Sequence, residues 1–131
     1  MEKMKAIICT KYGAPEVLQL QEVEKPVPGK NEVLIKIHAT TAHIGDTKIR
    51  SLKPGMGKVR DFFFRPMMRL MLGISGPRNK ILGMDLAGEI CEAGSEVTRF
   101  KIGDQVFASA YKGYKFGAYA EYKCLHEDGL I

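Results

Sequence analysis

An imidazole, a carboxylate and an ammonium group lie within six residues of one another in the sequence, at His43, Asp46 and Lys48. Side chains of these types hold metal ions, transfer protons or orient polar groups of a substrate. Histidine is the one whose ordinary pKa lies near neutral pH. His43 is therefore a candidate to orient a substrate carbonyl or to donate a proton. The alternative is that it only bonds a neighbouring backbone group.

A second unusual stretch is 81–97, ILGMDLAGEICEAGSEV, which has the composition of a buried strand but contains glycines at 83, 88 and 94. Glycine weakens a strand, so three of them indicate a bulge or the close approach of another backbone. Directly after Gly83, the large apolar side chain of Met84 stands beside the carboxylate of Asp85.

These residues must be positioned by strands, because alternating apolar residues dominate the chain. The best strand is Glu32–Thr40, where Lys36 and His38 share the face opposite the apolar residues. The apolar face of this strand consists of Val33, Ile35, Ile37 and Ala39. Composition and turn residues predict further strands at 5–11, 17–23, 81–93, 105–109 and 117–124.

Two helical regions interrupt the strands. Asp46 can cap a short helix that begins just after it, a contribution of about 1 kcal/mol. Pro66 suits a first helical turn, and residues 67–72 suit a short helix that ends at Gly73. We therefore expect a helical insertion at about 58–73. Five or six strands with this insertion predict a mostly-β barrel or sandwich.

Length and composition fit one globular domain over residues 1–131, with 45% hydrophobic and 27% charged residues. The sequence has no apolar run of membrane-spanning length and no signal peptide at its amino end. Its three cysteines are an odd number and are widely separated, which disfavours a disulfide framework and favours the reducing cytoplasm. They are Cys9, Cys91 and Cys124.

The basic charge is concentrated in one segment. Residues 48–80 contain nine Lys or Arg against Asp61 alone, a net +8, which leaves −3 for the rest of the chain. Such a patch does not indicate a general nucleic-acid binder.

The methionine-rich part, 53–80, has three interpretations. The first is a solvated helix packed on the barrel, and the second is a lid over a cleft, with Arg65 and Arg69 near an anionic cofactor phosphate. The third, placed last, is shallow contact with a membrane or nucleic acid.

Three blocks of the sequence, 4–52, 81–108 and 117–125, resemble the medium-chain dehydrogenase/reductase superfamily. The resemblance is most specific in the spacing of Gly83, Gly88, Gly94 and Val97, and in V-x-x-F-x-x-G-D-x-V over 97–106. It implies a GroES-like distorted β-barrel that forms the catalytic amino-terminal domain of an alcohol-dehydrogenase-like enzyme. The glycine-bearing strands would then line the wall of the cleft beside the catalytic centre.

The resemblance also bears on zinc. Zinc-dependent relatives have a cysteine where this chain has His43, and a histidine where it has Met84. A catalytic zinc needs about three protein ligands, and a thioether is a poor one. The scattered cysteines do not supply a structural zinc loop either, so we expect no zinc. The chain resembles the zinc-independent quinone-oxidoreductase-like branch, in which an Asn-Pro-x-Asp segment is common. His43 departs from that pattern too.

Site roles follow from the resemblance. It implies catalytic roles for His43, Asp46 and Lys48, the last being near the position of a proton-relay histidine in zinc relatives. It implies a substrate cleft with Ile44, with Met84 as an apolar plug and with Asp85 as a hydrogen-bonded wall residue. It places the nicotinamide cofactor against His43, Ile44 and Gly45. The other histidines, His38 and His126, are expected to be structural.

A hydride-transferring enzyme also needs a dinucleotide site, whose signature is a glycine-rich turn in a βαβ unit. Gly55-Met56-Gly57 lacks the third glycine and a preceding strand. In the family, a Rossmann domain that binds NADP or NAD follows the barrel. We therefore expect a truncated chain that is inactive alone, from a homodimeric parent that reduces quinones or activated carbonyl or alkene compounds. The alternative is a GroES-like interaction module similar to a co-chaperonin, which a heptameric ring in size-exclusion chromatography would indicate.

Overall fold

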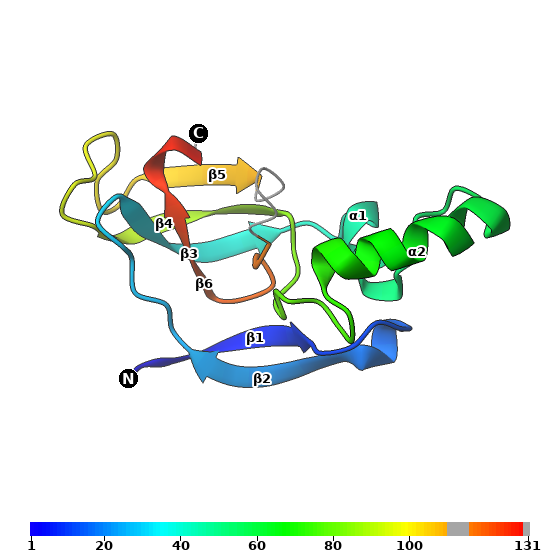
Figure 1. Ribbon diagram of the computed structural model, residues 1–131. Helices are drawn as coiled ribbons and strands as arrows, with labels where there is room; N and C mark the ends of the chain where they lie inside the picture. The colour runs from blue at the N-terminus through cyan, green and yellow to red at the C-terminus, as the bar shows by residue number, and fades with distance from the viewer. Residues whose placement is uncertain (110–115, 130–131) are drawn as a thin grey trace.

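The computed structural model describes residues 1–109 and 116–129 and consists mainly of two antiparallel sheets (Figure 1). Strands β1 and β2 form a two-stranded sheet, and the other four strands form a sheet in the order β5-β4-β3-β6. The strands are β1 (Lys3–Cys9), β2 (Leu18–Glu24), β3 (Glu32–Thr40), β4 (Asp85–Ala93), β5 (Gln105–Ser109) and β6 (Tyr122–His126). The helices are α1 (Ile44–Ser51) and α2 (Lys58–Leu72), with short 3-10 turns at Pro15–Val17 and Glu127–Gly129.

The six predicted strands are all present, but β1 lies two residues earlier than predicted, and β4 and β6 begin four and five residues later. The late starts of β4 and β6 have a local cause. Both late starts follow a glycine with positive φ, Gly83 at 106° and Gly117 at 140°. The residues before these two strands connect the sheets instead, because Ile81 forms an isolated bridge with Ile8 of β1, and a similar bridge joins Ala120 to the same strand. The mostly-β, GroES-like architecture is confirmed, but over the described residues the two sheets do not close into a barrel.

The main core is formed by apolar side chains from the strands of the larger sheet. Ile35 of β3 is paired with Ile90 of β4, and neither side chain is exposed to solvent. Apolar residues of all four strands pack around this pair, as the alternating patterns predict. They include Val33, Leu86, Val106, Ala108 and Leu125. The core therefore fixes the register of β3 against β4, whose amino end bears Met84 and Asp85.

The unusual glycines of β4 and its following turn are explained by close backbone approach. A Cβ atom on Gly88 would meet the Lys36 carbonyl of the paired strand, and one on Gly94 would meet the carbonyls of Gly29 and Lys30. Only glycine leaves room for backbone at these distances. The prediction of close approach is confirmed at both positions.

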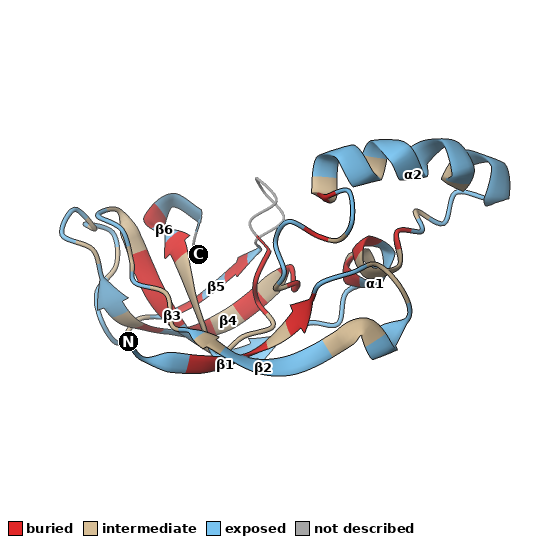
Figure 2. Cartoon of the chain, turned by 60° about the horizontal axis from the view of Figure 1, so that its bottom comes forward, coloured by how far each residue is buried: buried red, intermediate tan, exposed pale blue. Residues whose placement is uncertain are grey.

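Helix α2 extends from the body of the molecule, and Figure 2 shows it almost entirely in the colour of exposed residues. It ends at Gly73, as predicted, but it begins at Lys58, so Pro66 lies inside it and not in its first turn. Proline removes one intrahelical hydrogen bond, and the helix tolerates this loss because Pro66 is exposed and the freed carbonyl can be hydrated. Among the described residues, no helix is both long and apolar enough to span a membrane.

Candidate active site

The first site residues gather at the amino end of α1. His43 is the N-cap of this helix, and its Nδ1 accepts a hydrogen bond of 3.0 Å from the Gly45 amide. Asp46 is the third helical residue, and its Oδ2 accepts from the His43 amide at 3.2 Å. The two side chains form a reciprocal capping box. The prediction that the helix begins after Asp46 is therefore wrong, because His43 supplies the cap that was assigned to the carboxylate.

Asp46 connects three segments that are far apart in the sequence. It is 5% exposed, and its Oδ1 accepts a hydrogen bond from the Gly83 amide at 3.2 Å. The Tyr119 hydroxyl lies 2.9 Å from Asp46 Oδ2 and 2.9 Å from the Thr41 carbonyl oxygen, so its one proton serves both acceptors. Burial, followed by the hydrogen bond and the charge of Asp46, raises the pKa of Tyr119. Asp46 thereby fixes α1 against the turn that carries Met84.

Met84 lies against the start of α1. Its side chain is 5% exposed, and its Sδ lies 2.9 Å from where a Cβ atom on Gly45 would stand. It packs in a small apolar cluster with Cys9, Ile49, Leu82 and Phe116. Gly45 therefore leaves the space that Met84 fills.

A cavity of about 240 Å³ opens beside Met84. Lys48 and Ile49 of α1 line one part of it, and α2 lines another. The residues of α2 at the cavity are Met68, Met71 and Leu72. The inner face of α2 thus borders the cavity, as a lid does.

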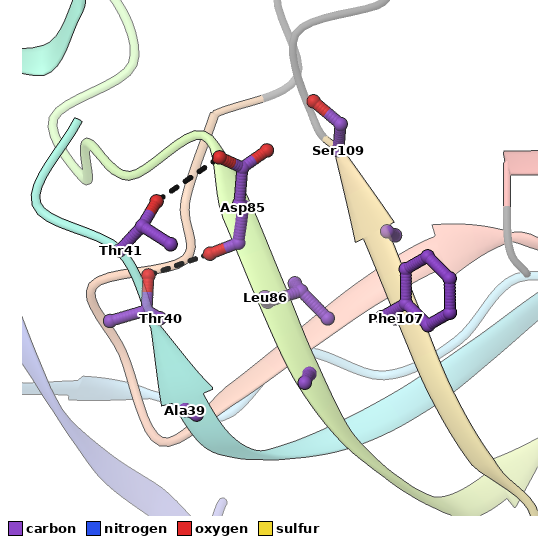
Figure 3. Close-up of a pocket in the computed structure, with 9 residues that line it drawn as sticks. Ala39, Thr40, Thr41, Asp85, Leu86, Phe107 and Ser109 are labelled. Carbon is purple, nitrogen blue, oxygen red and sulfur yellow. Dashed lines mark hydrogen bonds between the residues drawn. The ribbon is translucent and has the colours of Figure 1, made fainter. Parts of the chain in front are cut away.

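A second, larger hollow of about 460 Å³ lies at the ends of β3, β4 and β5. Figure 3 shows Asp85 there, with its Oδ2 accepting a 3.1 Å hydrogen bond from Thr41 Oγ1. Thr40 Oγ1 donates to the Asp85 carbonyl oxygen at 2.7 Å, and Phe107 covers part of the opposite side (Figure 3). Asp85 therefore lies on a different hollow from Met84, although the two are adjacent in the sequence.

The structure brings His43, Gly45, Asp46 and Met84 together at the start of α1. Of the predicted site residues, Gly45, Lys48 and Met84 line the cavity beside α2, whereas His43, Ile44 and Asp46 lie outside its lining. Sequence reasoning missed Thr41 and Tyr119, which hold Asp85 and Asp46. The only sequence signal for Tyr119 is its position inside the last family-like block, 117–125. Thr41 carried no signal, because a threonine after a strand is unremarkable.

The two remaining histidines lie elsewhere, as do Cys91 and Cys124, whereas Cys9 belongs to the apolar cluster around Met84. His38 Nε2 is 3.9 Å from Glu89, and His126 Nδ1 accepts from the Asp128 amide at 3.2 Å. The three cysteines are free thiols. These contacts agree with structural roles for both histidines.

The donor set at Met84 does not suit a zinc ion. His43 Nδ1 is already an acceptor for Gly45, and the Met84 sulfur is a thioether, a poor zinc ligand. Across the described residues, no three His, Cys, Asp or Glu side chains gather closely enough to hold a metal ion. A dinucleotide-binding βαβ unit also needs parallel strands, and every strand pair in the described part of the chain is antiparallel.

Comparison with known proteins identifies the family. The family model "Alcohol dehydrogenase GroES-like domain" matches residues 29–131. The chain belongs to this family. It is 36% identical over 126 residues to the quinone oxidoreductase of Sus scrofa, covering 95% of this chain and 32% of that protein. These matches confirm the resemblance to the quinone-oxidoreductase-like branch of the medium-chain dehydrogenase/reductase superfamily.

Solved structures agree with this family assignment. The quinone oxidoreductase from Coxiella burnetii superposes with a TM-score of 0.74 at 33% identity, over 99% of this chain and 37% of that one. The Escherichia coli quinone oxidoreductase, solved in complex with NADPH, gives 0.73 at 28% identity over 97% of this chain and 32% of that one. The chain therefore spans about a third of the length of the relatives it matches.

Proposed function

We propose that this GroES-like domain is the substrate-binding part of an NAD(P)H-dependent oxidoreductase that reduces quinones or activated carbonyl or alkene compounds without zinc. The observation that carries the proposal is the apolar cavity beside Met84, where a thioether packs on Gly45. A mainly apolar cavity with one charged residue, Lys48, in its lining suits a flat, weakly polar substrate. The quinone oxidoreductases among the relatives support this substrate class.

In this proposal, His43 is the proton donor or the group that orients the substrate. Because its Nδ1 accepts from the Gly45 amide, the neutral imidazole carries its proton on Nε2. The exposed side chain can present that proton to a carbonyl oxygen. Lys48, also exposed, is the second candidate for proton supply at the cavity.

The cofactor surface is proposed at the start of α1. Ile44 is 67% exposed, so its apolar side chain can lie against a nicotinamide ring, next to His43 and to Gly45, whose own open side is filled by Met84. Bound NAD(P)H supplies the hydride. Reduction of a quinone to the hydroquinone would take this hydride together with one proton, which His43 or Lys48 would donate. The rest of the dinucleotide is proposed to lie on a Rossmann domain outside this chain, in a homodimeric, cytoplasmic parent.

The experiment is NAD(P)H oxidation, followed by absorbance, with a series of quinones. We expect turnover from a protein that joins this domain to a dinucleotide-binding domain, and none from residues 1–131 alone. His43→Ala should lower kcat, and Met84→Ala should raise KM by enlarging the cavity. Ile102→Ser, an exposed substitution in the turn before β5, is the control. Equal turnover by residues 1–131 alone, or stoichiometric zinc in elemental analysis, would contradict the proposal.

A further inference from the structure

The outer face of α2 is an apolar surface that nothing in the described part of the chain covers. Asp61, Met68 and Leu72, seven and four positions apart, are the partly buried residues that face the body. The opposite face carries Val59, Phe63 and Leu70, which are 72%, 72% and 68% exposed. Residues four and seven positions apart share one side of a helix. Apolar side chains therefore face away from the protein along the whole of α2.

The apolar face is extended by two neighbours. Phe62 is 72% exposed and packs edge-to-face on Phe63, with ring centroids 5.6 Å apart. Met67 is 47% exposed. Soluble proteins rarely expose several neighbouring apolar side chains unless a partner covers them. The face is about 17 Å long from Val59 to Leu70, from the rise of 1.5 Å per residue in an α-helix.

Basic residues border this face on both sides. At 100° per residue, Arg60 lies on one flank, and Lys58 and Arg65 lie on the other flank, nearer the side of Asp61. Arg69 shares that second flank, but its guanidinium donates a 2.6 Å hydrogen bond to the Ile74 carbonyl oxygen and lies over the Tyr12 ring. The one acidic residue of α2, Asp61, is partly buried, and its Oδ1 accepts a 2.9 Å hydrogen bond from the Met56 amide in the loop before the helix. The helix thus has a net charge of +3 around an apolar strip.

This charge selects among possible partners. A second copy of the chain, docked face to face, would place two helices of the same charge side by side, which opposes association. An anionic surface matches the basic flanks. An apolar strip with Phe and Leu between Lys and Arg side chains is the pattern of helices that lie in the interface of a bilayer. Because α2 extends from the body, its outer face can lie flat on such a surface (Figures 1 and 2).

We propose that α2 docks the protein on a bilayer that contains anionic phospholipid. Phe62, Phe63 and Leu70 insert among the acyl chains, and the basic flanks contact the lipid phosphates. The inner face of the same helix borders the cavity beside Met84, so docking brings that cavity to the membrane surface. This binding activity goes beyond the proposed reaction and does not depend on it.

The test is co-sedimentation of the protein, expressed at its natural length, with large unilamellar vesicles. Vesicles of phosphatidylcholine alone are compared with vesicles that also contain phosphatidylglycerol, at low and high salt. We expect binding to the anionic vesicles and its loss at high salt. Sedimentation in neither lipid, or equally in both, would overturn the proposal.

Variants locate the contact. Phe63→Ser should lower the partition coefficient about tenfold or more, and Arg60→Gln about fivefold for one surface charge. The matched control is Ile102→Ser, which removes an apolar side chain that is 65% exposed in the loop between β4 and β5, away from α2 (Figure 1). Its binding should be unchanged, and circular dichroism should show all three variants folded. Unchanged binding by Phe63→Ser, or a dimer that Phe63→Ser dissociates, would refute docking on lipid through α2.

Discussion

Replacing Asp46 with alanine should destabilise the fold, because three hydrogen-bond donors then lose their acceptor. The Gly83 amide is buried, so leaving it without the Asp46 carboxylate costs about 1–3 kcal/mol of desolvation. Loss of the contact with the His43 amide removes a helix cap, about 1 kcal/mol. The Tyr119 hydroxyl keeps the Thr41 carbonyl as an acceptor, so its loss is smaller. The total is about 3 kcal/mol.

Asparagine is the matched substitution at this position. Its single side-chain oxygen can still accept from Gly83, and its amide can donate to the Tyr119 hydroxyl, which then donates to Thr41. The remaining loss is the contact with the His43 amide. We therefore expect Asp46→Asn to cost about 1 kcal/mol, well below the alanine variant.

Urea unfolding followed by circular dichroism measures both variants. The control is Asp104→Ala, which removes a partly exposed carboxylate with one backbone contact, from the Lys101 amide at 2.9 Å, and should cost about 1 kcal/mol. A double-mutant cycle of Asp46→Asn with Tyr119→Phe should show coupling, since the two side chains touch. If Asp46→Ala cost no more than Asp104→Ala, the role of Asp46 as the link between α1 and the Gly83 turn would be refuted.

Three further predictions follow from burial and charge. Gly88→Ala should cost about 1–3 kcal/mol in urea unfolding because its Cβ would press on the Lys36 carbonyl, whereas Gly129→Ala, with open space around it, should change stability by less than about 0.5 kcal/mol. Burial raises the pKa of Cys124 to about 11, so its thiol in the folded chain should react with Ellman's reagent at pH 8 about a hundredfold more slowly than in urea; equal rates would contradict this. The pKa of Tyr119 is raised from 10, so its contribution to stability is present below pH 10 and is lost as the pH rises above it. The Tyr119→Phe variant should lose less free energy of unfolding at alkaline pH than the unsubstituted protein. An equal loss in both proteins would argue against a buried hydroxyl at Tyr119.

The fold was predictable where the signal is local. Strand β3 has the predicted bounds because its apolar side chains alternate over nine residues, and α2 ends at Gly73 because glycine accommodates the positive φ of 137° there. The bounds predicted for the helical insertion, about 58–73, are confirmed by α2. The position of Pro66 was predicted wrongly because proline usually marks a first turn, and no local rule shows that an exposed proline is tolerated in the helix interior.

The candidate site was predictable only in part. The residue types at His43 and Met84 were sufficient to argue against zinc, since ligand chemistry depends on the atoms present. Their arrangement was not predictable, because Asp46 contacts Gly83 and Tyr119 across 37 and 73 positions of sequence. Asp85, placed beside Met84 by the sequence, lies on another hollow because the strand that begins there turns it toward Thr41.

The sequence by itself determined the family, the mostly-β architecture and the presence of a thioether at Met84. These properties depend on periodicity, on spacing and on the chemistry of single side chains. Only the tertiary structure decided that His43 caps α1, that a buried carboxylate joins three distant segments, and that α2 turns its aromatic face outward. Each of these depends on which groups meet across the fold, and long-range packing sets that.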